Sequence, residues 1–173
     1  VSISRGTKSL GANPVFSLQN GDRDFLDGYL YWATGNTIWR SNGEVIESVT
    51  SYPSGTSIVT DSVGITGSTI THSVSTESST GLRSYNVETG ENILLKEDAS
   101  ISGVHQAAVG DKRLFFNSGD LWVTDGTAEG TKSLGANPGF HLHYGDRDFL
   151  DGYLYWAGGN TIWRSNGEVI ESV

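Results

Sequence analysis

The strongest constraint on the fold of this chain is an internal repeat. Residues 6–49 and 130–173 align without a gap at an offset of 124 residues, and they agree at 39 of 44 positions. The ten letters "RDFLDGYLYW" stand in both copies, at 23–32 and at 147–156. A segment that is used twice in a chain of 173 residues must fit two places in one fold, which is typical of repeat architectures.

A shorter period lies inside the long one, because the 124-residue unit holds three degenerate copies of about 41 residues each. Each copy has a strand, a short loop, a strand, a Gly-containing turn and a last strand, and one more candidate strand precedes it. The copies are "DGYLYWATGNTIWRSNGEVIESV" (27–49), "GSTITHSVSTESSTGLRSYNVETGENILLKE" (67–97) and "GDKRLFFNSGDLWVTDGTAEGTKSL" (110–134). Four strands in about 41 residues indicate a β-propeller blade.

The local sequence also favours strands throughout the chain. Aromatic and β-branched runs such as "YLYWA" and "RLFFN" are bounded by Gly, Asp and Asn, and no window has apolar residues at helical spacing. We therefore predict an all-β chain, a β-propeller built of four-stranded antiparallel blades. The predicted division is an outer strand at 1–10, then blades at 11–49, 50–98, 99–134 and 135–173.

The predicted blades leave an unpaired outer strand at 1–10. It ends in "GTKSL", the letters that also close the third blade at 130–134. Two units of 124 residues would give six blades in 248 residues, 75 more than the 173 present. We expect missing sequence or a partner chain to complete the ring, so that the protein is a homo-oligomer or part of a larger repeat array.

Two motifs resemble known propeller repeats. "DLWVTDGTAEGTKSL" (120–134) is similar to bacterial repeat proteins with a Leu-Trp-x-x-Asp-Gly-Thr-x-x-Gly-Thr signature, which are often extracellular and predicted to form propellers. "LYWATGNTIWRSNGE" (30–44) resembles the Tyr-Trp-Thr-Asp propeller repeat of receptor ectodomains, with Ala33 and Thr34 in place of Thr-Asp. The resemblance implies a propeller fold and a secreted or cell-surface location.

The net charge of the chain limits the classes of partner that it can bind. A net charge of −9 disfavours nucleic acids and anionic membrane surfaces and favours a neutral or cationic partner. No apolar run approaches the roughly 20 residues that span a bilayer, so we expect no membrane insertion. The absence of cysteine excludes disulfides and thiol chemistry.

Candidate contact residues come from the positions at which the two long copies differ. The copies differ at 15, 17, 19, 20 and 34, and "NPVFSLQNGD" (13–22) becomes "NPGFHLHYGD" (137–146). Strand alternation puts 17 and 19 on one face, which we expect to be exposed. The predicted ligand-binding residues are Ser17, Gln19, Asn20, His141, His143 and Tyr144. The expected ligand is a protein or a glycan.

Metal binding is an alternative for some of these residues. His-x-His on a strand supplies half of a zinc or copper site, and carboxylates at alternate positions suit Ca²⁺. The candidate ligands are His141, His143, Asp22, Asp24, Asp146 and Asp148. The other reading is that the histidines are simply exposed and that the aspartates cap turns or pair with arginine. We expect no cofactor, with zinc or calcium as the alternative.

The repeated Trp positions predict a shared core. We expect "RDFLDGYLYW" to form two central strands of a blade, with the same surroundings in both copies. The tyrosines at 29, 31, 153 and 155 should lie on the face opposite to the buried residues. The residues expected to be buried between blades are Leu26, Leu30, Trp32, Leu150, Leu154 and Trp156.

These observations predict a non-enzymatic extracellular binding or adhesion module. No Cys and no Gly-x-Ser-x-Gly motif is present to support nucleophilic catalysis. One alternative is a carbohydrate-binding or carbohydrate-active propeller with its site around His141, His143, Tyr144 and the aspartates. The other is a structural or designed self-assembling propeller fragment.

Overall fold

The computed structural model describes residues 23–59, 62–97, 106–136, 138–139 and 147–173. Its strands run from β1 to β17, and the described residues contain no helical segment, which confirms the all-β prediction. An apolar helix of membrane-spanning length is therefore not found in the described part of the chain. The predicted outer strand at 1–10 lies outside the described residues.

The strands form four antiparallel sheets, which we call blades 1 to 4. Blade 1 contains β1 (Arg23–Leu26), β2 (Tyr29–Thr34), β3 (Thr37–Ser41) and β4 (Ile46–Ser51). Blade 2 contains β5 (Ser57–Ile58), β6 (Gly64–Thr66), β7 (Thr69–Ser75), β8 (Thr80–Asn86) and β9 (Asn92–Lys96). Blade 3 contains β10 (Gln106–Val109), β11 (Lys112–Asn117), β12 (Asp120–Thr124) and β13 (Lys132–Ala136). Blade 4 contains β14 (Arg147–Leu150), β15 (Tyr153–Gly158), β16 (Thr161–Ser165) and β17 (Ile170–Ser172).

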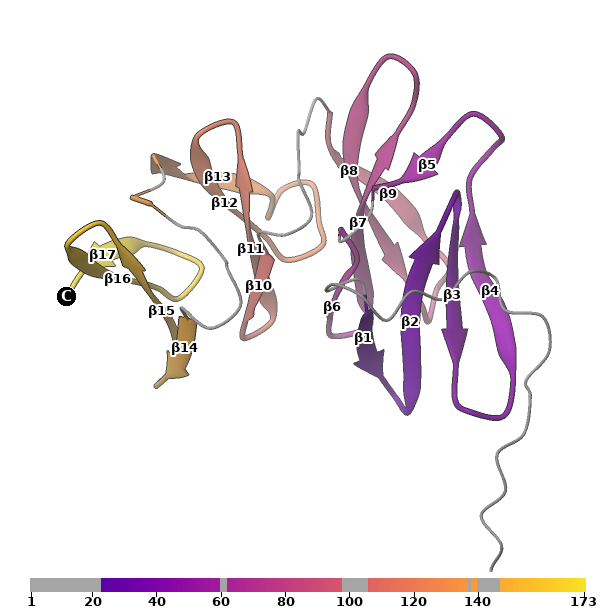
Figure 1. The fold of residues 1–173 in the computed structure, drawn as a ribbon, viewed down its shortest axis with the longest axis horizontal. Helices are drawn as coiled ribbons and strands as arrows, with labels where there is room; N and C mark the ends of the chain where they lie inside the picture. The colour runs from indigo at the N-terminus through magenta and orange to yellow at the C-terminus, as the bar shows by residue number, and fades with distance from the viewer. Residues whose placement is uncertain (1–22, 60–61, 98–105, 137, 140–146) are drawn as a thin grey trace, which may run out of the picture.

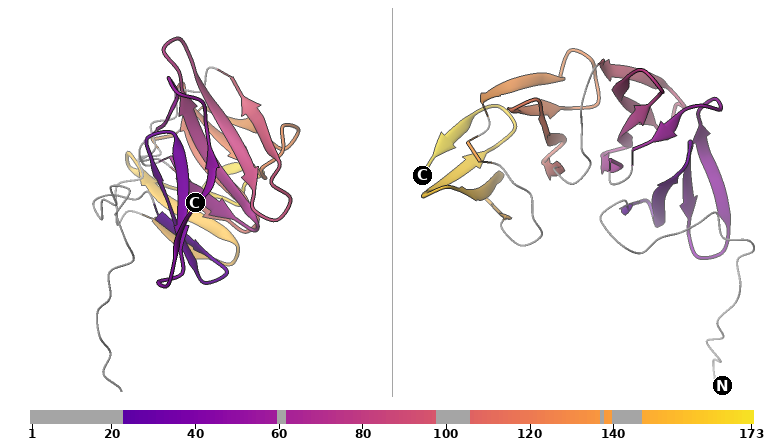
Figure 2. Two further views of the ribbon diagram at one scale, coloured as in Figure 1. Left: turned by 90° about the vertical axis from the view of Figure 1, so that its right-hand side faces the viewer. Right: turned by 45° about the horizontal axis from the view of Figure 1, so that its top comes forward.

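Consecutive strands are neighbours within blades 1, 3 and 4, whereas blade 2 is a five-stranded sheet in which both β5 and β6 pair with β7 (Figure 1). The blades follow one another along an arc, with β1–β4 at one end and β14–β17 at the other (Figure 2). The first strands β1, β6, β10 and β14 lie on the inner side of the arc. Four-stranded sheets arranged around an axis are the blades of a β-propeller, so the predicted fold class is confirmed.

Each pair of neighbouring blades shares an apolar cluster, and these clusters are the core. Between blades 1 and 2 the buried residues are Tyr31, Ile38, Ile58, Val63, Ile65, Ile70 and Val74. Between blades 2 and 3 they are Leu82, Leu95 and Phe115. Between blades 3 and 4 they are Ala107, Val109, Leu114, Leu121, Val123, Leu154 and Trp156. Burial between sheets therefore holds the blades side by side.

The repeated Asp-Gly turn determines which side chains share a face. Asp27 and Gly28 have φ values of 49° and 79°, the positive pair that a two-residue hairpin turn requires. Such a turn places Leu26 directly opposite Tyr29, on the tyrosine face of the blade. The prediction that Leu26 shares a face with Trp32 was therefore wrong, because it carried simple alternation across the turn. β1 also lies at the edge of the sheet, so "RDFLDGYLYW" does not form two central strands.

The two copies of this segment share a fold but differ in their surroundings. Trp32, Trp156 and Leu154 are buried, as predicted. Blade 4 packs its Leu-Trp face against blade 3, whereas blade 1 packs its tyrosine face, including Tyr31, against blade 2. Leu150 is consequently exposed, and the prediction of equal surroundings was wrong for the tyrosine face. The reason is that the copies stand at opposite ends of the arc.

Candidate functional site

Each blade has two edges, and different turns and connections lie at each of them. Because each sheet is an antiparallel meander, the turns between its second and third strands and the connections between blades fall at one edge. We call this the connection edge; it includes the turns at 35–36, 76–79, 118–119 and 159–160. In Figure 1 the turns β2–β3, β7–β8 and β11–β12 lie at the upper ends of their blades. The opposite, or hairpin, edge holds the remaining turns.

The hairpin edge is built from local hydrogen bonds. The Asn42 Oδ1 atom accepts hydrogen bonds from the backbone N–H groups of Glu44, at 2.9 Å, and Val45, at 3.1 Å. Asn86 and Asn166 accept the corresponding pairs of backbone N–H groups in blades 2 and 4. Asn side chains that bond their own turn in this way stabilise the reversal. Three blades therefore use the same structural turn at this edge.

The Leu-Trp-x-x-Asp-Gly-Thr-x-x-Gly-Thr signature also encodes a turn of the hairpin edge. Asp125 Oδ1 accepts hydrogen bonds from the backbone N–H and the hydroxyl of Thr127, at 2.9 and 2.7 Å. Burial raises the pKa of Asp125, but these hydrogen bonds outweigh it and the pKa lies below its ordinary value. A Cβ at Gly130 would lie 2.0 Å from the same carboxylate, so a side chain there would displace Asp125 from these hydrogen bonds. The Asp and Thr residues of the motif therefore have a structural role in this turn.

The two long copies differ at one connection-edge position within their described strands. Four of the five differing positions, 15, 17, 19 and 20, precede β1 in the first copy and lie outside the described residues there. The fifth is Thr34 in the first copy and Gly158 in the second, at the ends of β2 and β15 beside the connection-edge turns. Among the strands and turns that the structure describes in both copies, this is the only difference, and it lies at the connection edge.

Two of these differences are in contact in blade 4. A Cβ at Gly139 would lie 3.2 Å from the Cα atom of Gly158, and a Cβ at Gly158 would lie 2.1 Å from the Pro138 carbonyl oxygen. The first copy has Val15 and Thr34 at the equivalent positions. A side chain with a Cβ, such as Val or Thr, would not fit at 139 or 158 in this close packing of 138–139 on β15. The two glycines therefore form one linked change.

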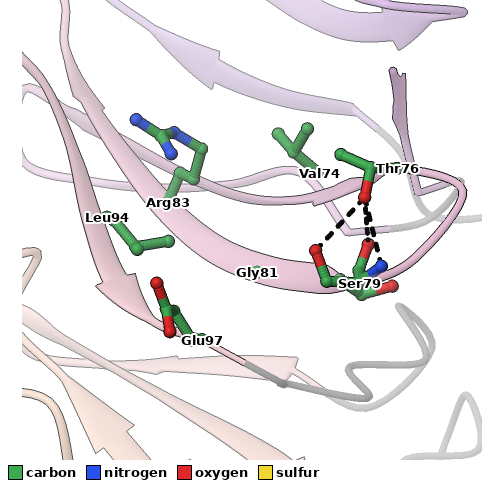
Figure 3. A pocket seen from close by; sticks show the side chains of 8 residues that line it. Val74, Thr76, Ser79, Gly81, Arg83, Leu94 and Glu97 are labelled. Carbon is green, nitrogen blue, oxygen red and sulfur yellow. Dashed lines mark hydrogen bonds between the residues drawn. The ribbon is translucent and has the colours of Figure 1, made fainter. Parts of the chain in front are cut away.

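Blade 2 has a hollow at the same edge, of about 280 Å³ (Figure 3). Figure 3 shows the Arg83 guanidinium and the Glu97 carboxylate on different sides of Leu94, with the hydroxyls of Thr76 and Ser79 near the β7–β8 turn. Thr76 Oγ1 accepts a hydrogen bond from the Ser79 N–H at 3.1 Å. The lining residues are Val74, Thr76, Ser79, Thr80, Gly81, Arg83, Leu94 and Glu97. This lining suits a small polar ligand.

A chain of hydrogen bonds holds Arg83 in place behind the hollow. Arg83 Nε donates to Asn92 Oδ1 at 3.0 Å, and Asn92 Nδ2 donates to the Tyr52 hydroxyl at 2.9 Å. His72 Nδ1 lies 3.3 Å from the Ile70 carbonyl oxygen and must donate to it, so His72 Nε2 accepts from the Tyr52 hydroxyl at 2.5 Å. Burial lowers the pKa of His72 to about 4 and raises that of Tyr52. Tyr52 and His72 are therefore both uncharged at neutral pH.

Most of the predicted site residues fall outside the described part of the chain. These are Ser17, Gln19, Asn20, Asp22, His141, His143, Tyr144 and Asp146. Asp24 lies in β1, and Asp148 in β14 is exposed and accepts a hydrogen bond from the Phe149 N–H at 2.8 Å. Among the described residues, no three His, Cys, Asp or Glu side chains gather as metal ligands do.

Sequence reasoning missed the hollow of blade 2. Tyr52 and His72 are 20 residues apart in the chain, and Tyr52 and Asn92 are 40 apart, so only the tertiary fold brings them together. Blade 2 has no second copy with which to compare it. The available signal was Arg83, the one charged residue of strand β8.

No protein family model and no curated protein sequence matches the chain. Solved β-propeller structures do match it. A quinonprotein alcohol dehydrogenase-like protein from Bacteroides thetaiotaomicron has a TM-score of 0.55 and 13% identity, over 88% of this chain and 40% of that one. Oligogalacturonate lyase in complex with manganese has a TM-score of 0.52 and 16% identity, over 78% and 43%. The N-terminal domain of Nup159 has a TM-score of 0.51 and 16% identity, over 84% and 40%. The chain thus spans less than half of each protein, and the likeness establishes the β-propeller fold alone.

Proposed function

We propose that this chain is a non-enzymatic binding module in which the connection edge of a β-propeller presents the contacts. The observation that carries the proposal is that the copies differ within their described strands only at Thr34 and Gly158, which lie at this edge. The other four differences precede β1 and β14 in the sequence. Random change would also reach the exposed turns of the hairpin edge, which are identical in both copies. A constant scaffold with one altered edge is the pattern of a binding surface.

The residues that change indicate the kind of ligand. The second copy replaces Ser, Gln and Asn with two imidazoles and a phenol, at His141, His143 and Tyr144. Aromatic rings with polar atoms stack on sugar rings and donate hydrogen bonds to hydroxyls. The net charge of −9 disfavours anionic ligands. A neutral glycan is therefore the proposed ligand, and a secreted or cell-surface location is proposed with it, on the resemblance to extracellular repeat proteins.

The test transfers the first copy's residues onto the second. The full chain and its triple variant His141→Ser, His143→Gln, Tyr144→Asn are screened on an array of neutral and acidic glycans. The proposal expects the wild-type chain to bind neutral glycans and the variant to lose binding at least tenfold, while the melting temperature stays unchanged. A matched control, Glu88→Gln with Thr89→Ser on the hairpin edge, should bind as the wild type does.

Two outcomes would overturn this proposal. One is that the triple variant retains wild-type glycan binding, and the other is that the hairpin-edge control loses it. Loss of folding in the triple variant would return the three side chains to a packing role. A wild-type chain that binds no array glycan also counts against the glycan class.

A carbohydrate-active enzyme is the second candidate, and the hollow of blade 2 favours it. Arg83 and Glu97 place a cation and a carboxylate around one space, a combination that suits an acidic sugar and a proton transfer. A protein of similar fold is an oligogalacturonate lyase. The test is incubation with oligogalacturonate: product that disappears in Glu97→Gln supports an enzyme, and absence of product excludes this substrate.

A further inference from the structure

The face of blade 4 that is turned away from blade 3 carries apolar side chains that no blade covers. Leu150, Ile162 and Val173 are 61%, 54% and 70% exposed. We call the surface to which they belong the open face. Its residues are Leu150, Tyr153, Tyr155, Ala157, Ile162 and Val173. A contiguous apolar surface of this kind marks an interaction site.

The same six residues are covered in blade 1. Their counterparts, at an offset of 124, are Leu26, Tyr29, Tyr31, Ala33, Ile38 and Val49. All six belong to the apolar cluster between blades 1 and 2. Ile38 is 0% exposed there, against 54% for Ile162. The molecule therefore contains the same surface twice, once with its cover and once without.

The cover of blade 1 is an aliphatic face of blade 2. Its buried members are all β-branched, as suits side chains that fill the space between two sheets. They are Ile58, Val63, Ile65, Ile70 and Val74. The cover is thus defined by its chemistry as well as by its position.

The open face is already shaped to receive this cover. Strands β1–β2 and β14–β15 have the same register, with Tyr31 opposite Asp24 and Tyr155 opposite Asp148. Each face also carries one ion pair beside its tyrosines, and the two match, at 2.7 Å for Arg40–Glu47 and 2.8 Å for Arg164–Glu171. The single difference inside the sheets, Thr34 against Gly158, lies on the opposite face, where Gly158 approaches Trp163.

We infer that the open face of blade 4 is a docking surface for a further propeller blade that has the aliphatic face of blade 2. A second copy of this chain is a poor source, because its own blade 1 already covers the blade 2 face. The fitting partner is a four-stranded sheet that presents Ile and Val in the blade 2 pattern. The surface is separate from the connection edge, so the ligand-binding proposal neither supports nor weakens it.

The experiment supplies this partner to the full chain. Residues 50–98 are added directly after Val173, so that the new junction repeats the natural junction after Val49. We expect amide hydrogen exchange in β15 and β16 to slow to the level of β2 and β3. We also expect Ile162→Ala to become as destabilising in the extended chain as Ile38→Ala. The matched control carries Asp in place of Ile70 and Val74 in the added copy only, and it should leave β15 and β16 as they are in the original chain.

Three results would overturn the inference. In the first, the added segment stays unfolded beside an intact blade 4. In the second, it folds and leaves exchange in β15 and β16 unchanged. In the third, the original chain already covers the face by dimerising, with a doubled mass in sedimentation that Ile162→Lys restores to the monomer value; the occupant is then a second copy.

Discussion

Two identical residues in different surroundings allow a matched test of the blade arrangement. Ile38 and Ile162 lie at equivalent positions of β3 and β16, but only Ile38 is covered by the next blade. Ile→Ala removes three carbon atoms, worth about 2 kcal/mol of transfer free energy when the side chain is fully buried. The cavity left behind adds to this, so we expect Ile38→Ala to cost about 2–5 kcal/mol of unfolding free energy.

Ile162→Ala should cost much less. With 54% of the residue exposed, at most about half of the transfer free energy is lost, and no closed cavity forms. We expect about 1 kcal/mol or less. The change in strand propensity is the same in both variants and cancels in the difference.

Urea unfolding followed by tryptophan fluorescence measures both costs, and hydrogen exchange assigns them to blades. Blade-by-blade unfolding is possible in repeat folds, so the exchange data decide which sheet is affected. Equal costs for the two variants would refute the arrangement. They would mean either that Ile162 is covered in solution or that blade 2 does not cover Ile38.

Three further variants test the core, the buried histidine and the glycine contact. Trp32→Ala and Trp156→Ala should each cost roughly 3–5 kcal/mol in urea unfolding, and a large difference between them would contradict equal burial. Because burial holds the folded pKa of His72 at about 4, below the ordinary 6.5, the unfolded chain binds the proton first. Unfolding free energy should therefore fall by up to about 3 kcal/mol as the pH drops from about 6.5 to 4; His72→Gln should flatten this profile, and an unaltered profile would exclude His72 as the cause. Gly158→Thr should cost roughly 1–3 kcal/mol, since its Cβ meets the Pro138 carbonyl oxygen; a neutral effect would show that 138–139 moves freely.

The sequence was sufficient to predict the class of fold. Strand-length apolar runs, Asn-Gly and Asp-Gly turns and a period of about 41 residues predicted antiparallel four-stranded blades, and the structure has them. These signals are local, so they are readable without knowledge of distant contacts. The positive φ angles of Asp27 and Gly28 are a direct instance.

Facing and burial were harder to predict, because they depend on neighbours. Leu26 was placed on the wrong face, since the two-residue turn pairs it directly with Tyr29. Leu150 was expected to be buried like Leu154, but it lies on the face that no blade covers. A repeat determines what a blade can pack against, while position in the arc determines whether that packing occurs.

The candidate site was only partly predictable for a similar reason. Comparison of the copies located the variable positions, of which the structure describes Thr34, Gly139 and Gly158, beside the connection-edge turns. The hollow beside Arg83 has no repeated counterpart and depends on Tyr52, which reaches it from the connection after β4. A comparison of repeated copies cannot detect a feature that occurs in only one blade.

The presence of "RDFLDGYLYW" at both ends of the arc follows from the two faces of a blade. The segment carries a Leu-Trp face, which in blade 4 packs Leu154 and Trp156 against the preceding blade. It also carries a tyrosine face, which in blade 1 packs Tyr31 against the following blade. Since one set of strands encodes both faces, a copied blade fits between any pair of suitable neighbours without a change of core. The difference that the structure describes inside the sheets, Thr34 against Gly158, lies at the connection edge and leaves the tyrosine face unchanged, so both copies keep the same strands and hairpin turns.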